Sequence, residues 1–194
     1  MPVAPRPPAA APPAAAPPRA PDAPPAVLLS AARIQARVAE LGRDVAAAHP
    51  GGRLVCVGVL KGSFVFLADL VRAIPLPEIE VDFMGVSSYE GSETTGVVRI
   101  TTDLARSIEG EHVLLVEDIV DTGLTVRYLL DNLATRRPRS LQVAALLEKP
   151  ARARVDVPID FKGFTIEDRF VVGYGLDHGG RWRNLPHVAV IDPG

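Results

Sequence analysis

The segment 113–125 limits the possible folds of this chain more than any other segment does. Residues 113–116 are four branched apolar residues, a run typical of a strand buried on both faces and therefore of a parallel sheet. Glu117 and Asp118 follow, then an Asp-Thr-Gly turn and helical spacing over residues 126–133. Ligands of open α/β sheets bind at the carboxyl ends of the strands, beside helix N-termini that attract anions. The segment predicts such a site, with acidic groups next to an anion-binding turn.

The rest of the chain indicates an α/β fold with a mainly parallel, twisted sheet flanked by helices. Ser30 resembles an N-cap and precedes apolar residues at helical spacing, and a second helix is predicted over residues 64–73. Residues 79–88 and 97–102 alternate apolar with polar residues around a polar loop, which indicates an antiparallel hairpin. We expect this hairpin and the short terminal strands to form a flanking hood subdomain. The predicted strands are 54–60, 79–88, 97–102, 113–116, 141–147, 159–161, 170–174 and 187–191.

Composition sets further limits. The first 26 residues contain 11 prolines and 10 alanines, which predicts a disordered tail before one domain over residues 27–194. The longest apolar runs are shorter than a membrane span requires, and the net charge of −2 gives no footprint for nucleic acid. The single cysteine, Cys56, lies in an apolar run, as expected of a buried thiol in a reducing cytoplasm.

Several short motifs carry polar chemistry, and each also has a plain structural reading. Glu117 and Asp118 could bind a metal ion or the vicinal hydroxyls of a sugar, or could simply end a strand in solvent. The turn after them has a glycine that permits close backbone approach, two hydroxyls and helix-start amides, which suit a phosphate monoester. Together these features suggest a ribose 5-phosphate. The residues of the turn are Asp121, Thr122, Gly123, Leu124 and Thr125.

Other polar residues also follow predicted strands. The amides of the Lys61-Gly62 turn could hold a second phosphate group, although a plain strand-to-helix turn would look the same. Lys149 could donate to a ligand carbonyl or be a solvated strand end. Residues 170–177 could form a stacking and metal site for a flat base or an edge strand, and Arg183 could meet phosphate or a surface carboxylate.

These residues together resemble the type I phosphoribosyltransferases, and within them the hypoxanthine and hypoxanthine-guanine enzymes, over nearly all of residues 27–194. Val-Glu-Asp-Ile-Val-Asp-Thr-Gly at 116–123 is similar to the family's signature for 5-phosphoribosyl 1-diphosphate. Residues 58–64 resemble the pyrophosphate loop, in which the family has a non-proline cis peptide before the lysine. Ser88 and Tyr89 resemble the start of the flexible loop that closes over the reacting centre, but Glu90 follows where many relatives have a small residue.

The resemblance implies transfer of a 5-phosphoribosyl group to N9 of a 6-oxopurine, with release of pyrophosphate. It implies Asp121 as general base at purine N7, and Mg²⁺ as the metal cofactor. The metal ligands it implies are Glu117, Asp118 and Asp177. The purine contacts it implies are Lys149, Phe170, Val171 and Asp177. The donor contacts it implies are Lys61, Gly62, Glu117, Asp118, Arg183 and residues 121–125.

Two rival interpretations remain to be weighed. A phospho-receiver domain also has an acidic pair and a lysine at strand ends, but the segment between Asp118 and Lys149 is too short for the two βα units which that order requires. A phosphoribosyltransferase-like regulator that binds RNA is the alternative function; the balanced charge argues against it. The expected partners are small-molecule substrates, with neither nucleic acid nor membrane, in a cytoplasmic homodimer or homotetramer. The preference among hypoxanthine, guanine and xanthine stays open.

Overall fold

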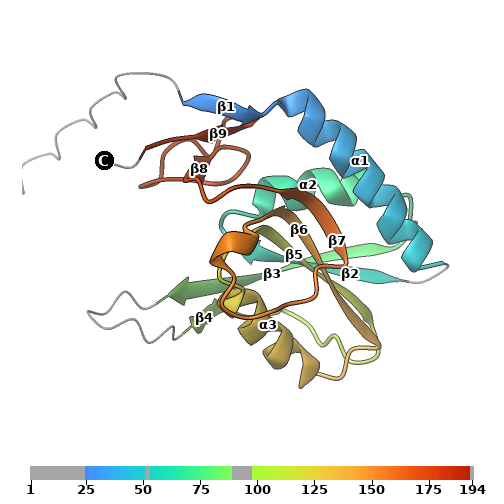
Figure 1. The fold of residues 1–194 in the computed structure, drawn as a ribbon. Helices are drawn as coiled ribbons and strands as arrows, with labels where there is room; N and C mark the ends of the chain where they lie inside the picture. Colours follow the sequence, from blue (N-terminus) through green and yellow to red (C-terminus); the bar gives the residue numbers. More distant parts are fainter. Residues whose placement is uncertain (1–24, 51–52, 89–97, 193–194) are drawn as a thin grey trace, which may run out of the picture.

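A computed structural model describes residues 25–50, 53–88 and 98–192 (Figure 1). Its main sheet has six strands in the order β4-β3-β2-β5-β6-β7. All neighbours in this sheet are parallel except β4, which pairs antiparallel with β3. The mainly parallel α/β fold is therefore confirmed. The strands are β2 (Leu54–Leu60), β3 (Ile79–Ser88), β4 (Val98–Thr102), β5 (His112–Val120), β6 (Ser140–Glu148) and β7 (Phe161–Thr165).

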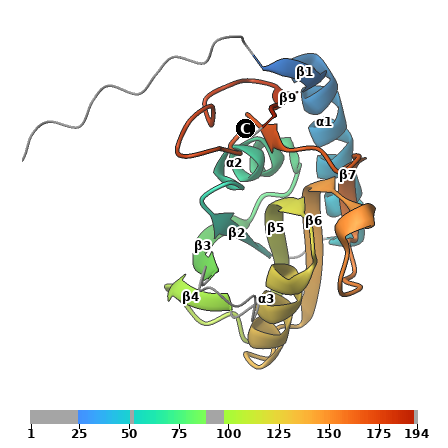
Figure 2. The same ribbon diagram turned by 60° about the vertical axis from the view of Figure 1, so that its left-hand side comes forward.

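Helices cover both faces of this sheet, as an apolar parallel sheet requires (Figure 2). Helices α1 (Ala31–Ala48) and α2 (Phe64–Ala73) lie on one face, and α3 (Leu124–Ala134) lies on the other. Strand β5 shows the consequence: Leu114 and Val116 belong to the core under α1 and α2, whereas Val113 and Leu115 belong to the core under α3. The apolar run that dominates the sequence is thus buried on both sides.

Helix α1 follows the expected N-cap chemistry. The Ser30 hydroxyl accepts a hydrogen bond from the backbone amide of Arg33 at 3.3 Å, which satisfies one of the free amides of the first turn. The residues at helical spacing face the core as predicted. They are Ile34, Val38, Leu41 and Val45.

A second sheet of three antiparallel strands forms the hood, in the order β1-β9-β8. Its strands are β1 (Ala26–Leu29), β8 (Val171–Val172) and β9 (Val188–Val190). Figures 1 and 2 show it at one end of the molecule, beside α2 and the start of α1. Strand β1 was not predicted, and its first residue, Ala26, falls within the range assigned to the tail.

The expected membership of the hood was wrong in part. The β3-β4 hairpin belongs to the main sheet, because β3 pairs in parallel with β2 over residues 79–85. The strand expected at 159–161 lies instead at Phe161–Thr165, as β7, where it extends the same sheet beside β6. Strand β5 also continues through Glu117 and Asp118 to Val120. Alternating polarity identifies a half-buried strand, but it does not say which neighbour the strand will pair with.

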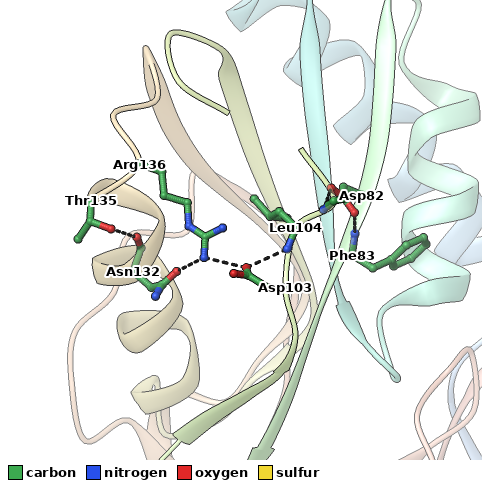
Figure 3. A network of polar contacts seen from close by, with 8 residues as sticks. Asp82, Phe83, Asp103, Leu104, Asn132, Thr135 and Arg136 are labelled. Carbon is green, nitrogen blue, oxygen red and sulfur yellow. Dashed lines mark hydrogen bonds and ion pairs between the residues drawn. The ribbon is translucent and has the colours of Figure 1, made fainter. Parts of the chain in front are cut away.

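A polar network fixes the base of the hairpin against α3 (Figure 3). Arg136, just after α3, donates to the Asp103 carboxylate at 2.7 Å and to the Asn132 side-chain oxygen at 2.8 Å. Asp103 follows β4, and its carboxylate also accepts from the amide of Leu104. The end of β4 is therefore held to the end of α3. No helix in the described ranges has both the length and the apolar character of a membrane span.

Candidate active site

The carboxyl ends of β2, β5 and β6 bring the predicted polar segments together. These strands lie side by side and run in the same direction, so the turns after Leu60, Val120 and Glu148 share one edge of the sheet. The first turn carries Lys61 and Gly62, and the last carries Lys149. The polar segments that the sequence places at strand ends therefore share this edge, and a small hollow lies between Asp121 and Lys149.

The turn after β2 packs tightly against the acidic pair. A Cβ on Gly62 would overlap the Oδ2 atom of Asp118, so only glycine fits this position without displacing the carboxylate. The peptide bond between Leu60 and Lys61 is cis, as expected from the family. The backbone of Gly62 and the carboxylate of Asp118 thus form one continuous surface at the site.

The acidic pair lies in a poorly solvated place. Burial raises the pKa of Glu117 well above its usual range, and the adjacent charge of Asp118 raises it further. Burial also raises the pKa of Asp118, to about 6, although backbone hydrogen bonds and the charge of Arg183 oppose this rise. Carboxylates that are costly to ionise are stabilised by a cation or by hydroxyl donors. The pair is therefore suited to bind either one.

The turn after β5 is built to receive an anion at the start of α3. Gly123 has a φ of +80°, and Val155 lies so close that a Cβ at this position would meet its carbonyl oxygen. Gly123 caps α3 without a side-chain hydrogen bond, which leaves amides of the first turn available. The hydroxyl of Thr122 accepts at 3.4 Å from the amide of Leu124. The turn, together with Thr125, lines a small hollow that also touches Glu117.

Asp121 lies at the mouth of this turn and has a charged neighbour. The Nε atom of Arg152 is 2.9 Å from Asp121 Oδ1. Arg152 ends the short 3₁₀ helix Pro150–Arg152, which follows Lys149 directly. Lys149 is only 6% exposed, so the alternative interpretation of this residue as a solvated strand end is wrong. Its Nζ atom lies 3.8 Å from a carboxylate oxygen of Asp168.

The hood contributes an aromatic and a charged group to the same region. Phe170, just before β8, is 40% exposed and meets the His178 ring edge-on with 5.1 Å between ring centroids. Val171 is buried within β8. Asp177 and Arg183 form an ion pair of 2.6 Å, and Arg183 also donates to the Gly175 carbonyl at 2.8 Å. The hood therefore contributes a partly exposed aromatic ring and the Asp177–Arg183 ion pair to this region.

Comparisons with known proteins agree with this geometry. The phosphoribosyl transferase domain family matches residues 28–178. The chain belongs to this family. A hypoxanthine-guanine phosphoribosyltransferase of Mycobacterium avium is 52% identical over 174 residues, which cover 86% of this chain and 85% of the relative. A hypoxanthine phosphoribosyltransferase of Salmonella typhimurium is 48% identical over 168 residues, covering 85% of this chain and 94% of the relative.

Solved structures show the same phosphoribosyltransferase fold. A hypoxanthine-guanine phosphoribosyltransferase of Bacillus anthracis superposes with a TM-score of 0.82 at 41% identity, covering 86% of this chain and 98% of the other. A hypoxanthine phosphoribosyltransferase of Trypanosoma cruzi in complex with IMP superposes with a TM-score of 0.82 at 40% identity, covering 91% and 98%. The type I phosphoribosyltransferase fold expected from the sequence is confirmed.

The three proposed metal ligands of this phosphoribosyltransferase are not gathered into one cluster. Within the described ranges, no group of three or more histidine, cysteine, aspartate or glutamate side chains is placed to hold a metal ion. Asp177 is held by Arg183 and also accepts from the amide of Gly180 at 2.7 Å. Glu117 lines the same hollow as the turn after β5, and Asp118 is next to it in the chain.

The two residues expected to begin the flexible loop are Ser88 and Tyr89. Ser88 is the last residue of β3, and Tyr89 lies outside the described residues. In contrast, Arg152 and Asp168 were missed by the sequence analysis, although Arg152 contacts Asp121 and Asp168 lies near Lys149. Arg152 follows Lys149 by three residues, but nothing local in the sequence says that this segment folds back over Asp121.

A wider hollow, of about 620 Å³, lies elsewhere, around the first residues of β3. Three of its charged side chains pair with one another: Glu80 binds Arg53 and lies 3.4 Å from Arg106. These groups are already satisfied by their partners. The carboxyl edge of the sheet, with its raised pKa values and free helix amides, is the better candidate for chemistry.

Proposed function

We infer that this protein is a purine salvage enzyme that transfers the 5-phosphoribosyl group from 5-phosphoribosyl 1-diphosphate to N9 of hypoxanthine or guanine, giving IMP or GMP and pyrophosphate. The observation that carries this inference is the meeting of three turns at one sheet edge: Lys61-Gly62, residues 121–125 and Lys149. Relatives of about half identity that are named hypoxanthine or hypoxanthine-guanine phosphoribosyltransferase support it.

The donor would occupy the edge between β2 and β5. Residues 121–125 would grip the 5-phosphate, because the start of α3 presents unpaired amides there. The backbone of Lys61-Gly62 would hold the diphosphate, with Arg183 on the same side. Glu117 and Asp118 would accept hydrogen bonds from the ribose hydroxyls. Their raised pKa values support this role, because a hydroxyl that donates to a buried carboxylate stabilises its charge in place of water.

The acidic pair also fits Mg²⁺. This ion prefers hard oxygen ligands and is usually bound by one or two carboxylates together with substrate phosphates, so a ready cluster of three side chains is not required. Glu117 and Asp118 would hold it, and Asp177 would lie on the diphosphate side. When bound, the ion neutralises the charge of the leaving diphosphate.

The purine would lie between the hood and the turn after β6. Phe170 would stack on the base, the backbone of Val171 would contact its edge, and Lys149 would donate to the 6-oxo group. The burial of Lys149 supports this role, since a buried ammonium needs an acceptor. Asp121 would take the proton from N7 while N9 bonds to C1′. Ser88 and Tyr89 would begin the loop that closes over the reacting groups.

Assembly and location are further parts of the proposal. We propose a cytoplasmic homodimer or homotetramer, in which residues 27–194 form the catalytic domain and the Pro/Ala-rich residues before it form a tail. The formal charge of −2 and the purine-site residues Lys149 and Phe170 favour catalysis over the RNA-binding alternative.

Initial rates would test the proposal. Purified protein with 5-phosphoribosyl 1-diphosphate and Mg²⁺ is expected to release pyrophosphate with hypoxanthine and guanine, to reject adenine, and to stop on chelation. Adenine has no 6-oxo group to accept from Lys149, and a site left with an unpaired polar group discriminates strongly. Turnover with xanthine would measure the breadth of the site. No turnover with any 6-oxopurine, together with salt-dependent RNA binding, would overturn the proposal.

A further inference from the structure

Arg152 contacts the proposed general base and has no role in the function described above. Its Nε atom is 2.9 Å from Asp121 Oδ1, a buried oxygen that accepts no aligned hydrogen bond in the described part of the chain. The arginine is thus the charge partner of this oxygen. About half of the Arg152 side chain is exposed, so its position is set by these charges and by its backbone rather than by packing.

The backbone around Arg152 is pinned to the turn that carries Asp121. The amide of Lys149 donates to the Val120 carbonyl at 2.9 Å, and the amide of Val155 donates to the Thr122 carbonyl at 3.3 Å. These hydrogen bonds lie on either side of Arg152 along the chain. The segment therefore cannot move away from Asp121 without breaking them.

A second carboxylate holds the other end of the guanidinium. Asp168 Oδ1 lies 3.7 Å from Arg152 Nη1 and 3.8 Å from Lys149 Nζ. The same oxygen thus faces both the proposed base-reading lysine and the arginine. Because Asp168 limits how far Arg152 can swing, the arginine keeps its contact with Asp121.

We propose that Arg152 is the positioning residue of the general base. It holds Asp121 Oδ1, which leaves Oδ2 directed to the purine. As N9 forms its bond to C1′, the bond from C1′ to the diphosphate oxygen breaks and pyrophosphate leaves with the electron pair. The N7 proton then passes to Asp121 Oδ2, so that the nucleotide product is neutral at its base. This inference rests on the proposed function, since it concerns the base of the same reaction.

Steady-state kinetics of three variants would test the role. Arg152→Ala is expected to lower kcat roughly tenfold, because a misplaced catalytic group loses much of its effect, while KM for the diphosphate donor stays within about twofold. Arg152→Lys should recover part of kcat by restoring the charge. Arg154→Ala is the matched control. Arg154 is an exposed arginine of the same segment, and its side chain forms no ion pair in the described ranges. This variant should behave as the wild type.

A double-mutant cycle with Asp121→Asn separates positioning from other roles. If Arg152 acts through Asp121, then Arg152→Ala should cost almost nothing further in the Asp121→Asn background. Fully additive losses, an unchanged kcat, or a several-fold rise in donor KM at unchanged kcat would overturn the proposal; the last result would assign Arg152 to the 5-phosphate. Melting temperatures confirm that each variant is folded. An inactive wild type would instead refute the proposed function.

Discussion

The hydroxyl of Tyr174 offers a sharp test of how the hood is attached. Tyr174 follows β8, is only 2% exposed, and donates to Asp69 Oδ2 at 2.7 Å. Asp69 lies on α2, the helix that begins just after the Lys61-Gly62 turn. This hydrogen bond therefore links the proposed purine wall to the helix behind the proposed diphosphate loop. Tyr174→Phe removes the bond and keeps the ring.

The structure sets the size of the effect. A hydrogen bond to a charged group contributes about 1.5–3 kcal/mol, and the loss is smaller when the acceptor keeps other partners. Asp69 keeps two, because Gln35 donates to it at 2.7 Å and Arg72 lies 3.1 Å away. We therefore expect Tyr174→Phe to lower the free energy of unfolding by about 1.5 kcal/mol. For a domain of this size, that corresponds to a fall in Tm of roughly 3–6 °C.

The loss of unfolding free energy in Tyr174→Phe should not depend on pH near neutrality. Burial and the contact with Asp69 raise the pKa of the Tyr174 hydroxyl above its usual value. A group with a raised pKa loses its contribution to stability only as the pH approaches the unfolded value, about 10, and beyond. The hydroxyl stays protonated in both states between about pH 6 and pH 9, so the difference in Tm should be constant there.

Thermal and urea denaturation of wild type, Tyr174→Phe and Tyr128→Phe would measure this. Tyr128 is 38% exposed and its hydroxyl forms no hydrogen bond within the described ranges, which makes it the matched control. An unchanged Tm for Tyr174→Phe, or an equal fall in Tyr128→Phe, would refute the reasoning.

Three other changes test the site and the core. Lys149→Ala should raise KM for hypoxanthine about tenfold to a hundredfold while donor KM changes little, since a charged hydrogen bond to the base is lost; equal effects on both constants would contradict its role. Gly62→Ala should displace the Asp118 carboxylate, raise donor KM about tenfold and cost about 1–3 kcal/mol in unfolding free energy. Cys56 is fully buried and burial raises its pKa to about 12, so a thiol reagent near pH 8 should label it only after unfolding; fast labelling of the native protein would show that the core opens.

Hydrophobic periodicity predicted most of the main sheet because its signal is local. The predicted helix over 64–73 and the strand over 54–60 match α2 and β2. Strand β1 escaped prediction because it is four residues long, follows a proline-rich stretch, and pairs with β9 from the other end of the described chain. The hairpin was assigned to the wrong sheet for the same reason: the choice of a neighbouring strand is made in three dimensions.

The proposed site residues could be predicted from short sequence motifs, whereas the contacts among them could not. Adjacent carboxylates are visible in the sequence, but their raised pKa values depend on burial that only the fold creates. The pairing of Asp177 with Arg183 depends on the turns between them. Arg152 and Asp168 were missed because they reach Asp121 and Lys149 only after β6 and β7 have been placed side by side.

The hood sheet also bears on the order in which the molecule folds. Its strands come from opposite ends of the described chain, with Val27 paired with Ala189, whereas β2, α2 and β3 are neighbours in sequence. Closing so long a loop is entropically costly and is rewarded only once the intervening parts are in place. We therefore expect the hood to form last and to open first by local unfolding, with its amides exchanging hydrogen faster than those of β5. The hood residues proposed to contact the purine would then be the part of the domain with the lowest local stability.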